Sequence, residues 1–561
     1  MRNINSKLVK PASAIFALSA AFLLCAGHAA ADTADITIFT QEKTGKIDPN
    51  VYGMNFVGYD PATYETWTKE YYGFSDYGAG MWDPKRGCPV SEAVDLAKDA
   101  GVKLARFPGG CGSHRYDWKK AIGSNRKHFL FGIDEFLTMC GQIGARAVIT
   151  LSFLTGTEQD AADLVEYLNA PADGSNPRGG IDWAKERAKN GRIEPYNVAF
   201  FEVGNEDWHG DHIKIKHVAA RDYAARYLRY FNAIKEADPQ AQVGAILYVP
   251  EWNRDVLSRI KDRIDFGVVH PYPSALLDYN TLATMTPEDS FQLTLANIPL
   301  VYEPYFQKML GVIREYAGKD VPLAVTEYNV GFDQSKPVPL RHTLGAALVN
   351  AEFLRVLMNP GNNIAMANHW EFSNSHWGMV YSTDDFQRHD YSLPIKYVRR
   401  PNFFVYELYA KHFGRELLKV EVNCPSYTVR SLNVPEKKKN VLQMIKQAVR
   451  ENEYPDCDID ARVPYLSVNA SKDEQSNTVY VIVVNKNMHK PMQTMLKLED
   501  FDAQPEVHAW ILKADQVTAM NENNTENVTI TQAQFKTAGN ETLIEFPPHS
   551  ITALEFRGHN T

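Results

Sequence analysis

The stretch FFEVGNEDWHG, residues 200–210, runs from an apolar segment into Gly204, Asn205, Glu206 and Asp207. The apolar segment predicts a strand, and two interpretations fit its polar end. Asn and Asp are common helix N-caps, so the end could begin a helix. Alternatively, a carboxylate at the carboxyl end of a barrel strand would lie at the barrel mouth, where such folds place their active sites.

Similar β-rich runs recur along the chain and are separated by helical patterns, several of which end in Gly or Pro. The eight runs cover residues 51–57, 103–109, 145–153, 200–206, 242–248, 265–273, 322–330 and 363–372. Almost continuously apolar strands that alternate with helices indicate parallel strands buried on both faces. Eight such units predict a (β/α)8 TIM barrel. The alternative, a doubly wound sheet, would favour a Gly-rich phosphate loop after the first strand, and residues 51–60 contain no GxGxxG.

The sequence pattern changes after residue 414. Runs such as NTVYVIVVNK there alternate apolar and polar residues, and they are separated by Asn, Pro and Gly. Alternation of this kind predicts antiparallel strands. We therefore expect the barrel over residues 49–414 and a C-terminal antiparallel β-sandwich domain over 415–561. Residues 32–48 are expected to add an N-terminal strand to that sandwich.

Residues 1–31 resemble a secretory signal peptide, because three basic residues precede an apolar run and Ala29 and Ala31 form an A-x-A pattern. The apolar run is shorter than a membrane span, so we expect cleavage, no membrane span and a secreted or periplasmic protein. Lipid attachment at Cys25 is disfavoured by bulky Leu24 before it.

The net charge of −9 disfavours a nucleic-acid partner. Five cysteines follow the leader without zinc-site spacing, and a disulfide between Cys424 and Cys457 is one interpretation of them. The basic segment 434–452 is interpreted as a solvated helix.

Chemically active side chains stand at the ends of five predicted strands. They are Arg106 on the second, Asn205 and Glu206 on the fourth, His270 and Tyr272 on the sixth, Glu327 on the seventh, and His369 and Trp370 on the eighth. A lone strand-end Glu is often a cap or an ion-pair partner, whereas two of them can meet across a barrel mouth. That pairing predicts glycoside hydrolysis with two carboxylates.

The expected roles are Glu327 as nucleophile and Glu206 as general acid and then base. Arg106 and the Tyr272 hydroxyl would keep the nucleophile ionised, and burial would help Glu206 to hold its proton. Asn205 and Trp370 are candidates for sugar binding. No metal site and no cofactor are expected. A non-catalytic sugar-binding barrel would explain the aromatic residues but not two facing carboxylates.

The segments ARFPGGCGSHRYDWKKAIG, FFEVGNEDWHG, VVHPYP and VTEYNVGF resemble family 51 glycoside hydrolases, the α-L-arabinofuranosidases among retaining TIM-barrel glycosidases. The similarity extends from about residue 48 through the C-terminal sandwich. It implies Glu206 as acid/base, Glu327 as nucleophile, Asn205 as a ligand of a substrate hydroxyl, and Arg106, His270 and Tyr272 as supports.

The chain departs from the family at two strands. Val57 stands where the family's first strand carries a sugar-binding Glu, and His369 and Trp370 stand where its eighth strand carries a Gln. The resemblance implies an α-L-arabinofuranosidase acting on a polysaccharide or oligosaccharide, and it suggests a homo-oligomer; secretion is expected from the leader. The alternative is an endo-β-glycanase or an exo-β-glycosidase of the same clan.

Overall fold

The computed structural model describes residues 32–56, 78–124, 126, 130–210, 217–277, 279–332, 335–382, 397–433, 458–522 and 524–559. Several predictions fall outside these ranges: the signal peptide 1–31, Val57, the basic segment 434–452 and Cys457. The proposed disulfide of Cys424 therefore stays a prediction. Among the described helices, none combines the length and apolar character that crossing a bilayer requires.

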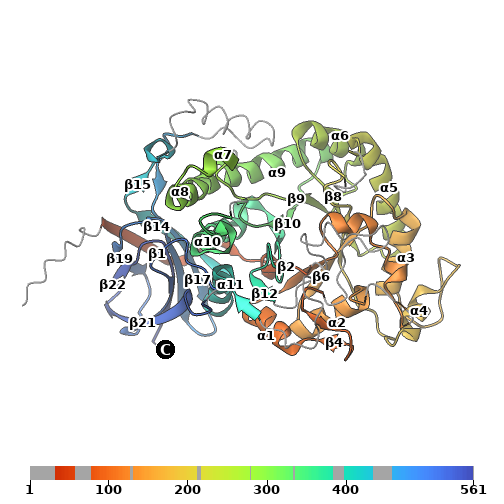
Figure 1. The fold of residues 1–561 in the computed structure, drawn as a ribbon, viewed down its shortest axis with the longest axis horizontal. Coiled ribbons are helices and arrows are strands. Elements are labelled where there is room, and N and C mark those ends of the chain that lie inside the picture. Colours follow the sequence, from red (N-terminus) through yellow and green to blue (C-terminus); the bar gives the residue numbers. More distant parts are fainter. Residues whose placement is uncertain are drawn as a thin grey trace, which may run out of the picture.

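Eight parallel strands close into a barrel, on the right in Figure 1. In ring order they are β2 (Gly53–Asn55), β5 (Leu104–Phe107), β6 (Arg146–Leu151), β7 (Phe200–Val203), β8 (Gln242–Ile246), β9 (Phe266–Val269), β10 (Leu323–Tyr328) and β11 (Ile364–His369). Every strand lies within one of the eight predicted runs, and β11 pairs with β2 to close the ring. The TIM-barrel prediction is confirmed.

Helices lie outside this ring because each presents an apolar face to the strands. In α5, for example, Tyr223, Tyr227, Tyr230 and Ile234 are buried and recur every three or four residues. The helices are α1 (Ser91–Asp99), α2 (Ile133–Ile143), α3 (Glu158–Asn169), α4 (Trp183–Lys189), α5 (Ala220–Ala237), α6 (Pro250–Ile260), α7 (Tyr279–Leu282), α8 (Pro287–Asn297), α9 (Glu303–Ala317), α10 (Leu344–Leu357) and α11 (Pro401–Lys411).

The C-terminal domain is a mostly antiparallel sheet of nine strands, which confirms the predicted β-domain. Its ring order is β1 (Asp32–Lys46), β14 (Glu416–Asn423), β17 (Leu466–Asp473), β18 (Thr478–Asn485), β23 (Ser550–Arg557), β20 (Glu506–Lys513), β21 (Thr529–Ala538), β22 (Glu541–Phe546) and β19 (Met492–Glu499). β1 pairs antiparallel with β14 and parallel with β19, so the N-terminal strand closes the sheet on itself.

Three short strand pairs lie outside the two large sheets. They are β3 (Trp82–Asp83) with β4 (Cys88–Pro89), β12 (Val380–Ser382) with β13 (Tyr397–Arg399), and β15 (Ser426–Tyr427) with β16 (Val463–Pro464).

The core around the barrel continues into the C-terminal domain, which also has a separate hydrophobic core inside its own sheet. α10 and α11 lie between them (Figure 1), with α10 against β17, β18 and β23 and α11 against β20, β21 and β23. Almost every residue of α10 is buried because the helix is covered on both sides. Ile482, Leu512 and Ile551 of the C-terminal sheet accordingly belong to the same core cluster as the barrel.

Candidate active site

The polar end of β7 is a tight turn at the carboxyl end of the barrel. Gly204 has φ 86° and Glu206 has φ 47°, both in the left-handed region. Residues 207–209 continue as a turn, and the next described helix, α5, begins only at Ala220, so the helix-cap interpretation of this end is wrong. Instead, the turn directs Glu206 into a cavity that also contains His270 and Tyr272.

Glu327, at the carboxyl end of β10, is almost completely buried and is held at both carboxylate oxygens. Arg106 Nη1 donates to Oε1 at 2.8 Å, and the Tyr272 hydroxyl donates to Oε2 at 2.8 Å. His270 Nδ1 lies 3.7 Å from Oε2. These contacts hold the carboxylate in one orientation, as a nucleophile requires.

Arg106 on β5 is fully buried and organises the floor of the site. It forms an ion pair with Glu202 and donates to Asn55 Oδ1 at 3.1 Å and to Asn205 Oδ1 at 2.8 Å. Burial alone would lower its pKa, but the carboxylates of Glu202 and Glu327 raise it. The guanidinium therefore stays charged and fixes Asn205 and Glu327 relative to each other.

Two histidines flank Glu206. His209 Nε2 lies 2.6 Å from Oε2, and His270 Nδ1 lies 2.8 Å from Oε1. His270 Nε2 is also within 2.9 Å of the Thr326 hydroxyl, which orients the ring.

These contacts shift the pKa of Glu206 in the direction opposite to the one expected from burial. Burial favours a raised pKa for Glu206, but the hydrogen bonds and charges of His209 and His270 outweigh it and hold the pKa below its ordinary value. Burial likewise opposes protonation of His209 and His270, and the neighbouring carboxylates raise the pKa of both imidazoles. These shifts favour an ionised Glu206 carboxylate beside protonated His209 and His270.

The two glutamates are close together. One oxygen of Glu206, one ring nitrogen of His270 and one oxygen of Glu327 all lie within 4.8 Å of one another. Cys111, Glu206 and His209 form a second group of the same size. Either group has donors that could hold a cation, but in both every imidazole and carboxylate already takes part in the hydrogen bonds above. Paired carboxylates at this distance are suited to glycosyl transfer.

Aromatic residues form the wall beside Glu327. Trp370, buried at the end of β11, clusters with Tyr272 and Trp377, and the Tyr272 and Trp377 rings are 5.7 Å apart. His369 instead packs edge-to-face against Tyr328 and Tyr406, and burial lowers its pKa to about 3. His369 therefore belongs to the neutral core, whereas Trp370 lies on the side of the site.

The cavity at Glu206 has a volume of about 300 Å³. Its other side is formed by Trp208, which stacks on Tyr248 with ring centroids 3.7 Å apart. The cavity therefore combines an acid, a histidine and flat aromatic faces, which is the composition expected of a sugar site.

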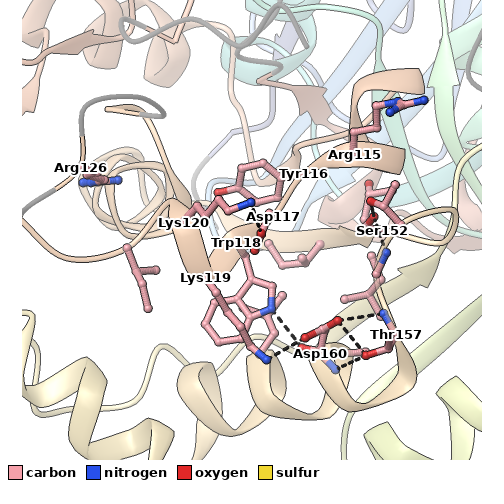
Figure 2. A pocket seen from close by; sticks show the side chains of 18 of the residues that line it. Arg115, Tyr116, Asp117, Trp118, Lys119, Lys120, Arg126, Ser152, Thr157 and Asp160 are labelled. Carbon is pink, nitrogen blue, oxygen red and sulfur yellow. Dashed lines mark hydrogen bonds and ion pairs between the residues drawn. The ribbon is translucent and has the colours of Figure 1, made fainter. Parts of the chain in front are cut away.

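A larger cavity of about 1180 Å³ lies beside β6 and α3. Figure 2 shows Lys119, Asp160 and Thr157 within it, joined to one another by hydrogen bonds. Arg126, also in its lining, pairs with Glu135. These charged groups neutralise each other, and the lining contains neither of the two glutamates of the site. The chemistry therefore belongs to the smaller cavity.

All seven predicted site residues lie in or around the same site, but several of its residues were not predicted. They are Asn55, Glu202, His209 and Trp377. Glu202 could have been found, because it is the one charged residue within β7 and it pairs in register with Thr150, whose hydroxyl binds it. His209 and Trp377 lie beyond strand ends in loops, so strand periodicity carries no signal for them.

Two family models match the chain. The α-L-arabinofuranosidase 1 domain matches residues 96–275, and the α-L-arabinofuranosidase C-terminal domain matches residues 326–550. Together they extend over both the barrel and the C-terminal sheet.

Curated relatives and solved structures agree with these matches. A protein of Aspergillus clavatus named probable α-L-arabinofuranosidase C is 23% identical, over 94% of this chain and 98% of the relative. An intracellular exo-α-L-arabinofuranosidase of Bacteroides ovatus is 24% identical, over 83% of this chain and 86% of the relative. The GH51 α-L-arabinofuranosidase of Thermotoga petrophila, at 22% identity, covers 93% of this chain and 100% of its own, with a TM-score of 0.69.

Proposed function

Since the chain belongs to the α-L-arabinofuranosidase-like glycoside hydrolases of family 51, we propose that it is a retaining α-L-arabinofuranosidase. Its substrate would be an arabinose-containing polysaccharide or oligosaccharide. The observation that carries the mechanism is that one carboxylate oxygen of Glu206 and one of Glu327 lie within 4.8 Å of each other. Retaining glycosidases have carboxyl groups about 5 to 5.5 Å apart, whereas inverting ones need about 6.5 to 9.5 Å to admit a water.

In the first step a Glu327 oxygen attacks the anomeric carbon of the sugar. The bond from that carbon to the leaving oxygen breaks, and Glu206 gives that oxygen a proton. Because His209 and His270 favour the ionised form of Glu206, the proton must first move to Glu206 from one of these histidines, each of which is in hydrogen-bond contact with it. Substrate that covers the cavity would favour this transfer, because exclusion of water disfavours separated charges.

In the second step a water attacks the same carbon and gives its proton to Glu206. The bond to Glu327 breaks, and Arg106 and Tyr272 stabilise the carboxylate that is released. The two displacements together retain the anomeric configuration.

The size of the cavity supports removal of single sugars. Its volume of about 300 Å³ is at the lower end for small-molecule sites and suits one ring better than a chain. Export by the leader 1–31 remains part of the proposal, in contrast to the Bacteroides ovatus relative, which is named intracellular.

A panel of para-nitrophenyl glycosides tests this function with wild type, Glu327→Gln and Glu206→Gln. We expect hydrolysis of the α-L-arabinofuranoside. Glu327→Gln should lose on the order of 10⁴-fold or more in kcat. Glu206→Gln should lose about 10² to 10⁴-fold, and more for alkyl than for nitrophenyl leaving groups, because only a poor leaving group needs the proton.

Glu166→Gln is the matched control. Glu166 is a buried carboxylate that accepts from the Trp183 N–H and pairs with Arg178, away from the cavity. The activity of the Glu166→Gln variant should therefore stay within about twofold of wild type. Cleavage of pyranosides alone would contradict the proposed sugar. If NMR showed the first-formed sugar with inverted configuration, the two-step mechanism would be wrong.

A further inference from the structure

A loop of the C-terminal domain, residues 514–528 between β20 and β21, is anchored on the barrel. The Leu344 N–H donates to the Ala519 carbonyl at 2.9 Å, and the Gly345 N–H donates to the Val517 carbonyl at 2.8 Å. The Asn521 amide donates to the Arg399 carbonyl at 2.8 Å. The loop is therefore fixed to the start of α10 and to the residue before Arg400.

Glu522 in this loop binds two donors of the barrel with a single oxygen. Arg400 Nε donates to Oε1 at 2.7 Å, and His342 Nδ1 lies 2.8 Å from the same atom. The Arg400 side chain is only 2% exposed, so its charge needs a partner within the protein. Glu522 supplies this partner from the other domain.

Arg400 and His342 both bind the loop that follows β11. The remaining N–H groups of Arg400 donate to the carbonyls of Ser375 at 2.7 Å and Gly378 at 2.6 Å. His342 Nε2 lies 2.9 Å from the His376 carbonyl. A single carboxylate thus orients the two side chains that fix residues 375–378.

This loop places Trp377 beside the active site, against Tyr272, which lines the cavity. The Arg341 guanidinium lies 3.5 Å from the centroid of the Trp377 ring, and its Nη1 also lies 2.7 Å from His376 Nε2. Trp377 packs on Tyr272, which donates its hydroxyl to the nucleophile Glu327.

We propose that Glu522 is a positioning residue of the active site, which acts through Arg400 and His342 to place Trp377 beside the bound sugar. The C-terminal domain is thereby part of the substrate site as well as a support for the barrel. This inference rests on the proposed function for the nature of the ligand, and on the contacts above for the positioning.

The test compares Glu522→Gln with Glu555→Gln. Both residues are carboxylates of the C-terminal domain that pair with a barrel histidine, and Glu555 Oε1 lies 2.9 Å from His412 Nδ1, outside the active site. Glu522→Gln should raise KM for the arabinofuranoside roughly tenfold and change kcat less than about threefold, because in this proposal Trp377 flanks the sugar and takes no part in the chemistry. Glu555→Gln should leave both constants within about twofold of wild type.

A double-mutant cycle with Trp377→Ala shows whether the effect passes through Trp377. In that background Glu522→Gln should change KM by less than about twofold, since the residue it positions is gone. An unchanged KM in Glu522→Gln, an equal effect in both backgrounds, or an equal effect of Glu555→Gln would overturn the inference. If the wild-type protein cleaves another glycoside instead, the proposed substrate is wrong. The comparison of Glu522→Gln with Glu555→Gln on that other substrate still tests whether Glu522 positions Trp377.

Discussion

Arg106 is the residue on which the site's geometry depends most, because one guanidinium binds Asn55, Glu202, Asn205 and Glu327. A lysine keeps the positive charge, but its single ammonium group cannot replace the planar array of N–H donors of the guanidinium. We expect Arg106→Lys to lower kcat/KM by at least about 10²-fold and the free energy of unfolding by about 2 to 4 kcal/mol. Steady-state kinetics and urea denaturation measure the two effects.

Arg187 provides a matched control because it is also a fully buried arginine, but its donors bind only backbone carbonyls, of Tyr167, Ala170, Arg192 and Ile193. Arg187→Lys should lose a similar free energy of unfolding and keep its kcat/KM within about threefold. Equal losses of activity in the two variants would mean that Arg106 acts only on stability.

At the scale of the element, the end of β7 sets the position of Glu206. An added Cβ at Gly204 would lie 1.9 Å from Asp207 Oδ2, and the φ of 86° is unfavourable for alanine. We expect Gly204→Ala to cost more than about 1 kcal/mol of unfolding free energy and to lower kcat at least about tenfold by displacing Glu206. Thermal unfolding and kinetics measure these changes.

The comparison is Gly141→Ala in α2, where an added Cβ meets no atom within 4 Å. This substitution should raise the unfolding free energy by about 0.5 to 1 kcal/mol, since Gly is a poor helix former, and it should leave kcat unchanged. A Gly204→Ala protein with wild-type kcat would show that the turn does not position the acid.

The elements themselves were predictable from the sequence because the barrel strands are almost continuously apolar runs and most of the helices have one apolar face. The carboxyl ends of parallel strands then brought Arg106, Glu206 and Glu327 into one site by topology alone. The lowered pKa of Glu206 was not predictable, because it depends on His270 and also on His209, three residues beyond Glu206 in a turn. The order of the strands also gives no indication that Glu522, far along the chain, binds the two side chains that hold the loop of Trp377.

At the scale of the whole molecule, carboxylates of the C-terminal domain fasten it to histidines and an arginine of the barrel. Burial opposes ionisation of Glu522, but His342 and Arg400 outweigh it and lower its pKa to about 2. Burial also opposes ionisation of Glu555, and His412 lowers the pKa of that carboxyl. Both residues thus stabilise the folded protein in their ionised form.

Acid should therefore weaken the attachment of the two domains. A carboxyl whose pKa is lower in the folded than in the unfolded state contributes its full stability above its ordinary pKa of 4.5 and loses it as the pH falls towards 2. For Glu522 this contribution is at most about 3 kcal/mol. In urea denaturation from pH 6 to pH 2.5, the difference between wild type and Glu522→Gln should be largest at pH 6 and shrink on acidification. A difference that stays constant over this range would show that the charge of Glu522 does not hold the domains together.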